Sequence, residues 1–382
     1  MQFDHLKRRE FIALLGGAAV ARPGAAISQL AQPARRIGVL VGTSEGDAEV
    51  HPYLLTFQKA LQDLGWTQDR NVQIDYRFAV SDPERIRTAA AELLRVKPDV
   101  LVAQSTPEVR ALLELTRMVP IVSPMIADPV GSGLVKSFAR PGGNITGFTN
   151  FEEGMGGKWL GLLKATAPDV SNVALVLHPN DEELSVGLRS SVETAASATG
   201  VGLTLIRDAH IERALDGFAR DSFARKVNSG LIVLPGIYTG VYRYSILALV
   251  AKYRWPAVYP FREWVVSGGL MSYGTDIAAA FRQTAVYVDR ILQGARPGEL
   301  PIQAPTKFQL VISLWAAKVL ELTIPPSLLC TRLSWRVSLS LRMSPRSASA
   351  ASLIWLATMS CRTPGKVAHA RPFASVQKPS HM

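Results

Sequence analysis

Short apolar runs alternate along residues 36–329 with segments whose apolar residues recur every three or four positions. The runs have the length of buried strands, and the recurring segments have the spacing of amphipathic helices. A helix is predicted to start at Asp82-Pro83, a capping residue followed by proline, and to bury Ile86, Ala90 and Leu93. The predicted strands are residues 37–41, 72–78, 100–103, 120–122, 145–148, 173–177, 203–206, 231–234, 257–259, 270–273 and 307–312.

Strand and helix alternate twice, with a restart after the turn at residues 141–144 (PGGN). A long helix is expected at about residues 276–292 and a shorter one at 314–322. Such alternation is typical of parallel, doubly wound sheets. The sequence therefore predicts an α/β protein with two Rossmann-like lobes and a cleft between them. Ligands of such sheets bind at the carboxyl ends of the strands, so the loops facing the cleft are expected to carry the function.

The charge lies at the two ends of the chain. The net charge is +11, of which +4 falls in residues 1–36 and +8 in residues 330–382, so the body is close to neutral. A basic groove for nucleic acid is therefore not expected. Cys330 and Cys361 are the only cysteines, and no two of the six histidines have HxxxH spacing. A disulfide framework, a cysteine-rich zinc site and a helical zinc-protease site are excluded.

The N-terminus has the order of an export signal. Lys7-Arg8-Arg9 precedes an apolar stretch from Phe11 to Val20, which is too short to span a bilayer, and small residues follow. Residues 1–28 are therefore interpreted as a signal, with cleavage near residue 28. Arg8-Arg9 resembles the twin-arginine type, and an ordinary Sec signal is the alternative. No cysteine lies near the cleavage point, which favours a soluble periplasmic protein over a lipid-anchored one.

The C-terminal end changes character at Cys330. Residues 330–382 are rich in serine and arginine and contain no acidic residue. The tail is expected to be disordered, and the hypothesis is that it is an out-of-frame or read-through extension. A basic interaction tail is the alternative.

Motifs for catalysis are incomplete. Gly154–Lys158 has no glycine at the earlier position that a phosphate loop needs, and Gly131-Ser132-Gly133 lacks the spacing of a nucleophile elbow. His51 and His178 are interpreted as loop or packing histidines rather than catalytic bases. No enzyme activity, cofactor or metal is expected.

Three stretches together resemble one family of exported proteins. They are residues 127–135 (ADPVGSGLV) with 139–147 (ARPGGNITG), 259–263 (YPFRE) leading into 268–274 (GGLMSYG), and 305–308 (PTKF) leading into 322–329 (LTIPPSLL). The set is similar to the substrate-binding proteins of bacterial ABC transporters, in the family that includes tryptophan and tyrosine binders. The resemblance covers about residues 36–329, and family chains usually end near the equivalent of Leu329.

The resemblance implies a type I periplasmic-binding fold whose hinged lobes close on a small ligand, with three chain crossings. Lobe 1 is expected at residues 37–148 plus about 264–303, and lobe 2 at residues 149–263 plus about 304–329. It also implies an ABC permease in the inner membrane as partner. We expect no nucleic-acid partner and a monomer.

Hydroxyl and carboxylate groups at predicted loop ends are candidates for polar contacts with the ligand. Ser105 and Thr106 stand at a helix N-terminus, where a ligand carboxylate would be stabilised, although Thr106 capping its own helix is the alternative. Thr43 and Ser44 offer similar chemistry after the first strand. Asp128 is a candidate for a ligand ammonium, with helix capping as its alternative.

Aromatic side chains near the cleft of the second lobe are candidates for stacking on the ligand. They are Phe151, Tyr238, Tyr259 and Phe261, each with a core position as the alternative. Ammonium, carboxylate and aromatic groups together suit an amino acid. The resemblance, together with the export signal, implies a periplasmic solute-binding component of an ABC importer that binds a small organic ligand between its lobes. Two alternatives are a ligand-sensing protein of the same fold with a signalling partner, and a secreted α/β enzyme.

Overall fold

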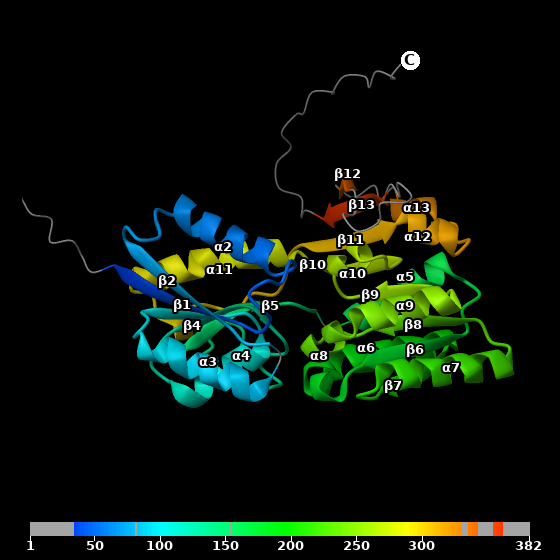
Figure 1. Ribbon diagram of the computed structural model, residues 1–382, viewed down its shortest axis with the longest axis horizontal. Helices are drawn as coiled ribbons and strands as arrows, with labels where there is room; N and C mark the ends of the chain where they lie inside the picture. Colours follow the sequence, from blue (N-terminus) through cyan, green and yellow to red (C-terminus); the bar gives the residue numbers. More distant parts are fainter. Residues whose placement is uncertain (1–33, 81, 153, 330–334, 343–353, 362–382) are drawn as a thin grey trace, which may run out of the picture.

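The computed structural model describes residues 34–80, 82–152, 154–329, 335–342 and 354–361. Two α/β lobes lie side by side (Figure 1), each built on its own sheet. The predicted export signal, residues 1–28, lies outside the described residues. Within the described part of the chain no helix is both long and apolar enough to cross a membrane.

Lobe 1 contains a five-stranded, fully parallel sheet in the order β2-β1-β3-β4-β5. Its strands are β1 (Arg35–Val41), β2 (Val72–Phe78), β3 (Val100–Ala103), β4 (Ile121–Ile126) and β5 (Ile145–Thr149). Its helices are α2 (His51–Asp63), α3 (Pro83–Arg95), α4 (Thr106–Leu115) and α11 (Ile277–Leu292), with the 3₁₀ turn η2 (Pro297–Glu299). The sheet is buried on both faces, which explains why its central strands are continuous apolar runs.

Alternation along β1 divides the core of lobe 1 into two layers. Val39 packs with α2 and α11 on one face, whereas Leu40 packs with α3 and α4 on the other. The start of α3 confirms the predicted cap, because the Asp82 carboxylate accepts hydrogen bonds from the backbone N–H groups of Glu84 and Arg85.

Lobe 2 contains an eight-stranded sheet in the order β12-β13-β11-β10-β9-β8-β6-β7. Its strands are β6 (Asn172–Leu177), β7 (Gly202–Arg207), β8 (Ser229–Val233), β9 (Ala257–Tyr259), β10 (Met271–Thr275), β11 (Phe308–Ser313), β12 (Trp335–Arg342) and β13 (Ile354–Cys361). Its helices are α5 (Met155–Thr166), α6 (Glu182–Thr199), α7 (Ile211–Arg225), α8 (Ile237–Val241), α9 (Arg243–Tyr253), α10 (Arg262–Val266), α12 (Leu314–Val319) and α13 (Pro326–Leu329), with the 3₁₀ turn η1 (Pro179–Asp181). Strands β6 to β10 are parallel, and β11 joins β10 in the antiparallel direction.

Three crossings join the lobes, and one of them is later in the chain than expected. The chain leaves lobe 1 after β5, returns between β10 and α11, and leaves again before β11. The expectation placed the second crossing at about residue 264, but α10 and β10 pack in lobe 2. The physical reason is strand pairing. β10 is hydrogen-bonded to β9 and β11 in the lobe 2 sheet, so the chain can return to lobe 1 only after β10 ends.

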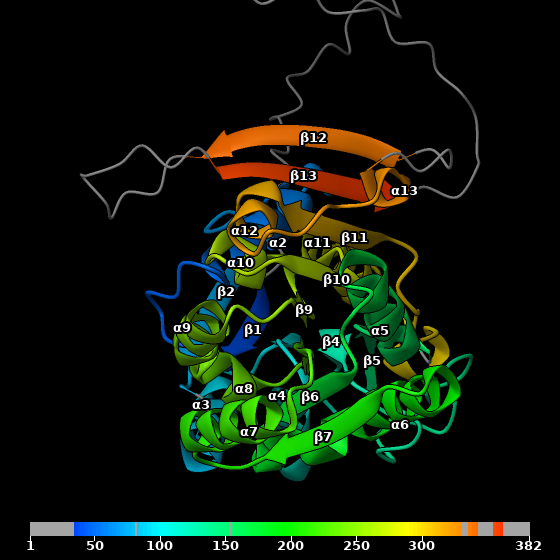
Figure 2. The same cartoon turned by 90° about the vertical axis from the view of Figure 1, so that its right-hand side faces the viewer.

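Two segments of the C-terminal tail are strands, which corrects the expectation that the tail is disordered throughout. β13 pairs with β11 at the edge of the lobe 2 sheet, and β12 pairs with β13 (Figure 2). Apolar and polar residues alternate strictly along residues 335–342 (WRVSLSLR), which is the pattern of a strand. An unpaired edge of β11 is a ready template for added strands. The rest of residues 330–382 lies outside the described part of the chain.

Candidate ligand-binding site

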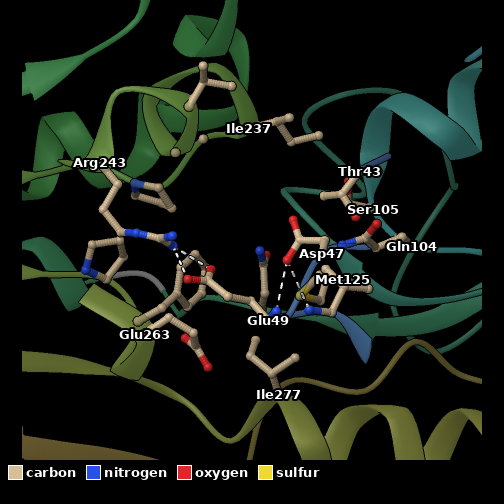
Figure 3. A pocket seen from close by; sticks show the side chains of 18 of the residues that line it. Thr43, Asp47, Glu49, Gln104, Ser105, Met125, Ile237, Arg243, Glu263 and Ile277 are labelled. Carbon is tan, nitrogen blue, oxygen red and sulfur yellow. Dashed lines mark hydrogen bonds and ion pairs between the residues drawn. The ribbon is translucent and has the colours of Figure 1, made fainter. Parts of the chain in front are cut away.

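A cavity of about 340 Å³ lies between the two lobes (Figure 3) and is lined by residues from both. Lobe 1 contributes Thr43, Ser44, Asp47, Glu49, Val50, Tyr53, Val80, Gln104, Ser105, Thr106, Pro107, Met125, Ala127 and Ile277. Lobe 2 and the first crossing contribute Asn150, Phe151, Leu234, Pro235, Gly236, Ile237, Gly240, Val241, Arg243, Pro260, Phe261, Glu263 and Trp264. The cavity lies where the carboxyl ends of both sheets face each other, and its size suits a small organic molecule.

The loop after β1 brings Thr43, Ser44 and Asp47 to the cavity wall. One Asp47 carboxylate oxygen, Oδ1, accepts backbone hydrogen bonds from Glu49 (2.8 Å) and Val50 (3.4 Å). These bonds hold the side chain where the loop enters α2. Figure 3 shows its other oxygen turned toward the open space between the lobes.

The N-terminus of α4 also reaches the cavity, but much of its hydrogen-bonding capacity is used inside the protein. Ser105 precedes the helix, and its backbone N–H and its hydroxyl both donate to Glu108 Oε2, at 2.9 and 2.7 Å. The Thr106 hydroxyl is buried and accepts a hydrogen bond from the Ala127 N–H. Ser105 therefore caps the helix, and Thr106 ties it to the loop after β4.

Glu108 is a buried carboxyl directly behind this wall. Its side chain is fully buried, and its Oε1 atom has no hydrogen-bond partner. Burial raises the pKa of Glu108 to about 7, against the lowering effect of its bonds from Ser105. The Glu108 carboxyl therefore titrates close to neutral pH.

Two polar contacts join the lobes across the cavity. The Arg243 guanidinium at the start of α9 is paired with the Glu49 carboxylate, and the Tyr53 hydroxyl donates to the Glu263 carboxylate. Burial raises the pKa of Glu49; the Arg243 hydrogen bond opposes this rise, whereas repulsion from Glu263 and Asp47 adds to it. Burial, followed by the charge of Glu263, also raises the pKa of Tyr53. Both contacts can form only while the lobes face each other closely.

Six of the predicted site residues lie at the cavity and three lie outside it. Among the polar candidates, Thr43, Ser44, Ser105 and Thr106 line the cavity, and among the aromatic ones Phe151 and Phe261 do. The rings of Phe151 and Phe261 are 5.6 Å apart. The structure thus brings together six of the nine predicted residues, from both lobes.

The other three predicted residues are elsewhere, which corrects their expected positions. Tyr259 is fully buried and stacks on Trp264 at 5.0 Å, because it belongs to the buried strand β9. Tyr238 stacks on His178 at 5.2 Å, outside the cavity lining. Asp128 also lies outside the lining, and its carboxylate accepts the Gly131 N–H at 2.8 Å and caps its own turn.

Sequence reasoning missed the charged residues of the cavity, namely Asp47, Glu49, Arg243 and Glu263. A signal existed for Asp47 and Glu49, because they follow the first strand in the loop that also holds Thr43 and Ser44. The pairing of Arg243 with Glu49 joins residues 194 positions apart, which no local pattern indicates. Among the residues that the structure describes, no cluster of His, Cys, Asp or Glu is arranged to hold a metal ion.

Comparisons with known proteins agree with this architecture. A family model described as ABC transporter substrate binding protein matches residues 38–334. The chain therefore belongs to the family of ABC transporter substrate-binding proteins, whose members bind solutes. Its fold is that of the type I periplasmic binding proteins.

Individual relatives are distant in sequence and close in fold. A tyrosine-binding protein of Clostridioides difficile (strain R20291) is 24% identical over 273 residues, which are 70% of this chain and 75% of that protein. A structure from Streptococcus pneumonia in complex with L-Trp has a TM-score of 0.70 at 24% identity and covers 78% of this chain and 97% of its own. A conserved domain protein from Vibrio cholerae has a TM-score of 0.69 at 27% identity, with coverages of 77% and 97%. The matched family region ends at residue 334, just before β12.

Proposed function

We propose that this protein is the exported solute-binding component of an ABC importer and that it binds an amino acid in the cavity between its lobes. The observation that carries the proposal is the cavity itself, which is lined by hydroxyl, amide and charged groups and also by apolar and aromatic side chains. An amino acid with an apolar side chain combines the same two kinds of group. The names of the relatives, a tyrosine binder and a tryptophan complex, support this ligand class.

Binding of the ligand would favour the closed arrangement of the two lobes. A ligand that touches both walls stabilises the closed arrangement by its difference in affinity between the closed and open states. The ion pair and hydrogen bond between the lobes favour the same arrangement. The closed form is then the one that a membrane permease would recognise.

Thermal unfolding of the full chain against the twenty L-amino acids tests this proposal. A ligand of the native state raises the midpoint by mass action, by an amount that grows with ligand concentration. We expect a rise with aromatic or large aliphatic amino acids. If no amino acid shifts the midpoint at millimolar concentration, the proposed ligand class is wrong.

We propose export to the periplasm from the signal-like residues 1–28. Cell fractionation followed by N-terminal sequencing tests this proposal. A protein that is found in the cytoplasm and still begins at Met1 would contradict it. Replacing both Arg8 and Arg9 by lysine separates the two routes. Export through the twin-arginine pathway is expected to stop, whereas Sec export continues because the positive charge remains.

The out-of-frame or read-through origin of residues 330–382 also stays a proposal. It is supported by the change in composition at Cys330 and by the end of the family match at residue 334. Intact mass of the exported protein tests it. A species ending near Leu329 is expected, and a stable full-length tail argues for a role of its own.

A further inference from the structure

A buried carboxyl lies directly behind the part of the lobe 1 wall that is rich in hydrogen-bond donors. The Glu108 side chain is fully buried, and its Oε1 atom has no hydrogen-bond partner among the described residues. A Cβ atom placed on Gly42 would lie 2.2 Å from this oxygen, so the carboxyl fills the space behind the loop after β1. The next residue of that loop, Thr43, lines the cavity, and within the described part of the chain its buried hydroxyl has no partner either. An unused hydroxyl and a buried carboxyl therefore lie on the two sides of one wall.

Ser105 connects the buried carboxyl to the cavity. Its hydroxyl donates to Glu108 Oε2 at 2.7 Å and accepts from the backbone N–H of Glu108 in the capping box at the start of α4. A hydroxyl has one donor and two acceptor positions. While Glu108 is ionised, the Ser105 donor is used, and only an acceptor position is left for a ligand. When Glu108 is protonated, its Oε2–H can donate to Ser105 Oγ instead, and the Ser105 donor is released toward the cavity that this residue lines.

A negatively charged ligand group at this wall favours the protonated form of Glu108 for two reasons. A ligand carboxylate needs donors, and protonation adds the Ser105 hydroxyl to the Thr43 hydroxyl and the start of α4. Repulsion between the ligand carboxylate and an ionised Glu108 would also raise the pKa of the buried group. Burial, opposed by the bonds from Ser105, already places the pKa of Glu108 at about 7. Proton uptake on binding therefore requires little free energy near neutral pH.

No charged neighbour sets the protonation of Glu108. The charged groups on the surrounding elements are Glu45, Asp47 and Glu49 in the loop after β1, Asp82, Glu84, Arg85 and Arg87 in the first two turns of α3, Asp128 after β4, and Arg110 and Glu114 on α4. None of them is among the causes that shift the pKa of Glu108. The lobe 2 group that interacts with Glu108 is the Tyr238 hydroxyl, whose pKa is raised by burial and, to a smaller extent, by Glu108 and other carboxylates. That hydroxyl is neutral near pH 7, so Glu108 is the group that takes up the proton.

We propose that a ligand carboxylate binds at Thr43, Ser105 and the start of α4, and that its binding is coupled to the uptake of one proton by Glu108. The proton comes from solvent and bonds to Glu108 Oε2, Oε2–H then donates to Ser105 Oγ, and the Ser105 hydroxyl donates to the ligand. Glu108 is thus a positioning residue, which acts on the ligand through Ser105. The proposal rests on the proposed amino-acid binding and adds to it a dependence on pH, with tighter binding below about pH 7 than above it.

Isothermal titration calorimetry of the full chain tests the proposal, with L-tryptophan as the first probe and L-leucine as the second. Titrations at about pH 7.5 in phosphate and in Tris, two buffers whose heats of ionisation differ, give the number of protons taken up. We expect an uptake of about half a proton per bound amino acid and about tenfold weaker affinity at pH 8.5 than at pH 6.5. Both results follow if the bound carboxylate raises the pKa of Glu108 by one to two units.

Glu108→Gln removes the titrating group and keeps its shape. This variant is expected to take up no proton at about pH 7.5 and to bind L-tryptophan with the same affinity at pH 6.5 and pH 8.5, to within about twofold. Glu114→Gln is the matched control, because Glu114 is an exposed carboxylate of the same helix outside the cavity lining. It should keep the proton uptake and the pH dependence of the wild type.

Ser105→Ala leaves the carboxyl in place and guards against misfolding of the first variant. It removes the hydroxyl that is shared between Glu108 and the ligand. We expect it to weaken L-tryptophan by about tenfold at pH 6.5 and by less at pH 8.5, because the Ser105 donor is free without ligand only while Glu108 is protonated. An equal loss at both pH values would contradict the role of Ser105 as the connection to Glu108.

The outcomes separate this proposal from the proposed function. If an amino acid binds without proton uptake at about pH 7.5, or if Glu108→Gln takes up as many protons as the wild type, the coupling to Glu108 is overturned while solute binding stands. If none of the twenty L-amino acids binds, the proposed function fails, and this proposal fails with it.

Discussion

The two walls of the cavity differ in chemistry. Lobe 1 presents hydroxyl, amide and carboxylate groups beside apolar residues such as Met125 and Ile277, whereas lobe 2 and the first crossing present mainly the apolar residues Phe151, Ile237, Val241, Phe261 and Trp264. The two charged residues that lobe 2 adds, Arg243 and Glu263, are bonded to lobe 1 side chains. We therefore propose that most polar contacts with the ligand come from lobe 1, and that lobe 2 supplies a mainly apolar cover with contacts that hold it closed.

The difference in chemistry between the two walls follows from the loops and helices that form each wall. In lobe 1 the loops after β1 and β3 lead into α2 and α4; Asp47 accepts from the Glu49 N–H in the turn before α2, and Ser105 caps α4. In lobe 2 the chain after β8 and β9 enters two five-residue helices, α8 and α10. These short helices place apolar residues at the cavity. The comparison predicts that changes in the two lobes have different consequences.

Filling the cavity from the lobe 2 side is expected to have the largest effect. Gly240 lines the cavity, and a Cβ atom there meets nothing within 4 Å. Gly240→Phe therefore places a ring in the ligand space with little strain and is expected to abolish binding in calorimetry. Gly161→Phe is the matched control, because Gly161 is an exposed helical position with the same open surroundings. Unchanged affinity in Gly240→Phe would show that the ligand lies elsewhere.

The buried carboxyl behind the lobe 1 wall is also expected to control the stability of the unliganded protein. An unfolded chain ionises Glu108 near its ordinary pKa of 4.5, whereas the folded chain keeps the proton until about pH 7. The free energy of unfolding should therefore fall as pH rises through this window. Glu108→Gln keeps the shape without the charge and is expected to be more stable than wild type at pH 8, by up to about 3 kcal/mol, with the difference vanishing below pH 4.5.

Urea unfolding at pH 4 and pH 8 measures this difference. Glu299→Gln is the control, because Glu299 is exposed and its change should shift stability little at either pH. A Glu108→Gln variant less stable than wild type at pH 8 would contradict the assigned cost of burying the ionised carboxylate. The carboxylate behind the lobe 2 wall, Asp181, offers a contrast, since three donors from Tyr238 and Thr239 satisfy it.

Breaking the ion pair between the lobes is expected to weaken every ligand alike. Arg243→Gln leaves Glu49 unpaired in the cleft, which should cost about 1–2 kcal/mol of closure, or about tenfold in affinity. The side chains of Arg243 and Glu49 are 13% and 32% exposed, so solvent screening keeps the loss moderate. Adding Glu49→Gln to the Arg243→Gln variant should recover part of the lost affinity. A double-mutant cycle measures the coupling between Arg243 and Glu49 in ligand affinity, and small-angle scattering of the unliganded protein measures lobe closure. If the affinity losses of the two single variants add up in the double variant, the pair is not a closing contact.

Removal of the Tyr53 hydroxyl is expected to give the smallest effect. Tyr53→Phe keeps the ring, which stacks on Phe281 at 5.7 Å, and removes the hydrogen bond to Glu263. The expected loss is about 0.5–1.5 kcal/mol in ligand affinity, with little change in the unfolding midpoint of the unliganded chain. Calorimetry with L-tryptophan measures it. A loss larger than that of Arg243→Gln would reverse the order of importance of the two contacts.

Much of the fold was predictable from local pattern. The strands at residues 72–78, 100–103 and 257–259 have the predicted bounds, and the others agree within a few residues. Short apolar runs between capped helices define strands because burial on both faces demands continuous apolar side chains. Two features escaped this reasoning: the late crossing after β10, and β12 and β13 in the tail. Both depend on strand pairing, which local pattern does not specify.

The residues that line the cavity were predictable only in part, and more so in lobe 1 than in lobe 2. Thr43, Ser44, Ser105 and Thr106 follow strands directly, so their place at the sheet edge follows from topology. Phe261 lines the cavity, but Tyr259, two positions earlier, does not, since one is past the end of β9 and the other within it. The end of a strand is predicted only to within one or two residues, and a shift of that size decides whether a side chain lies in the core or lines the cavity.

The amino-acid sequence alone therefore determined the α/β class, the two lobes and the polar loops at their edges, because these follow from hydrophobic spacing and capping along the chain. The tertiary structure decided which charges meet. It paired Arg243 with Glu49, brought Tyr53 to Glu263 and left Asp47 facing the cavity. Electrostatic pairing depends on distances between residues remote in the chain, and only the folded arrangement of both lobes sets those distances.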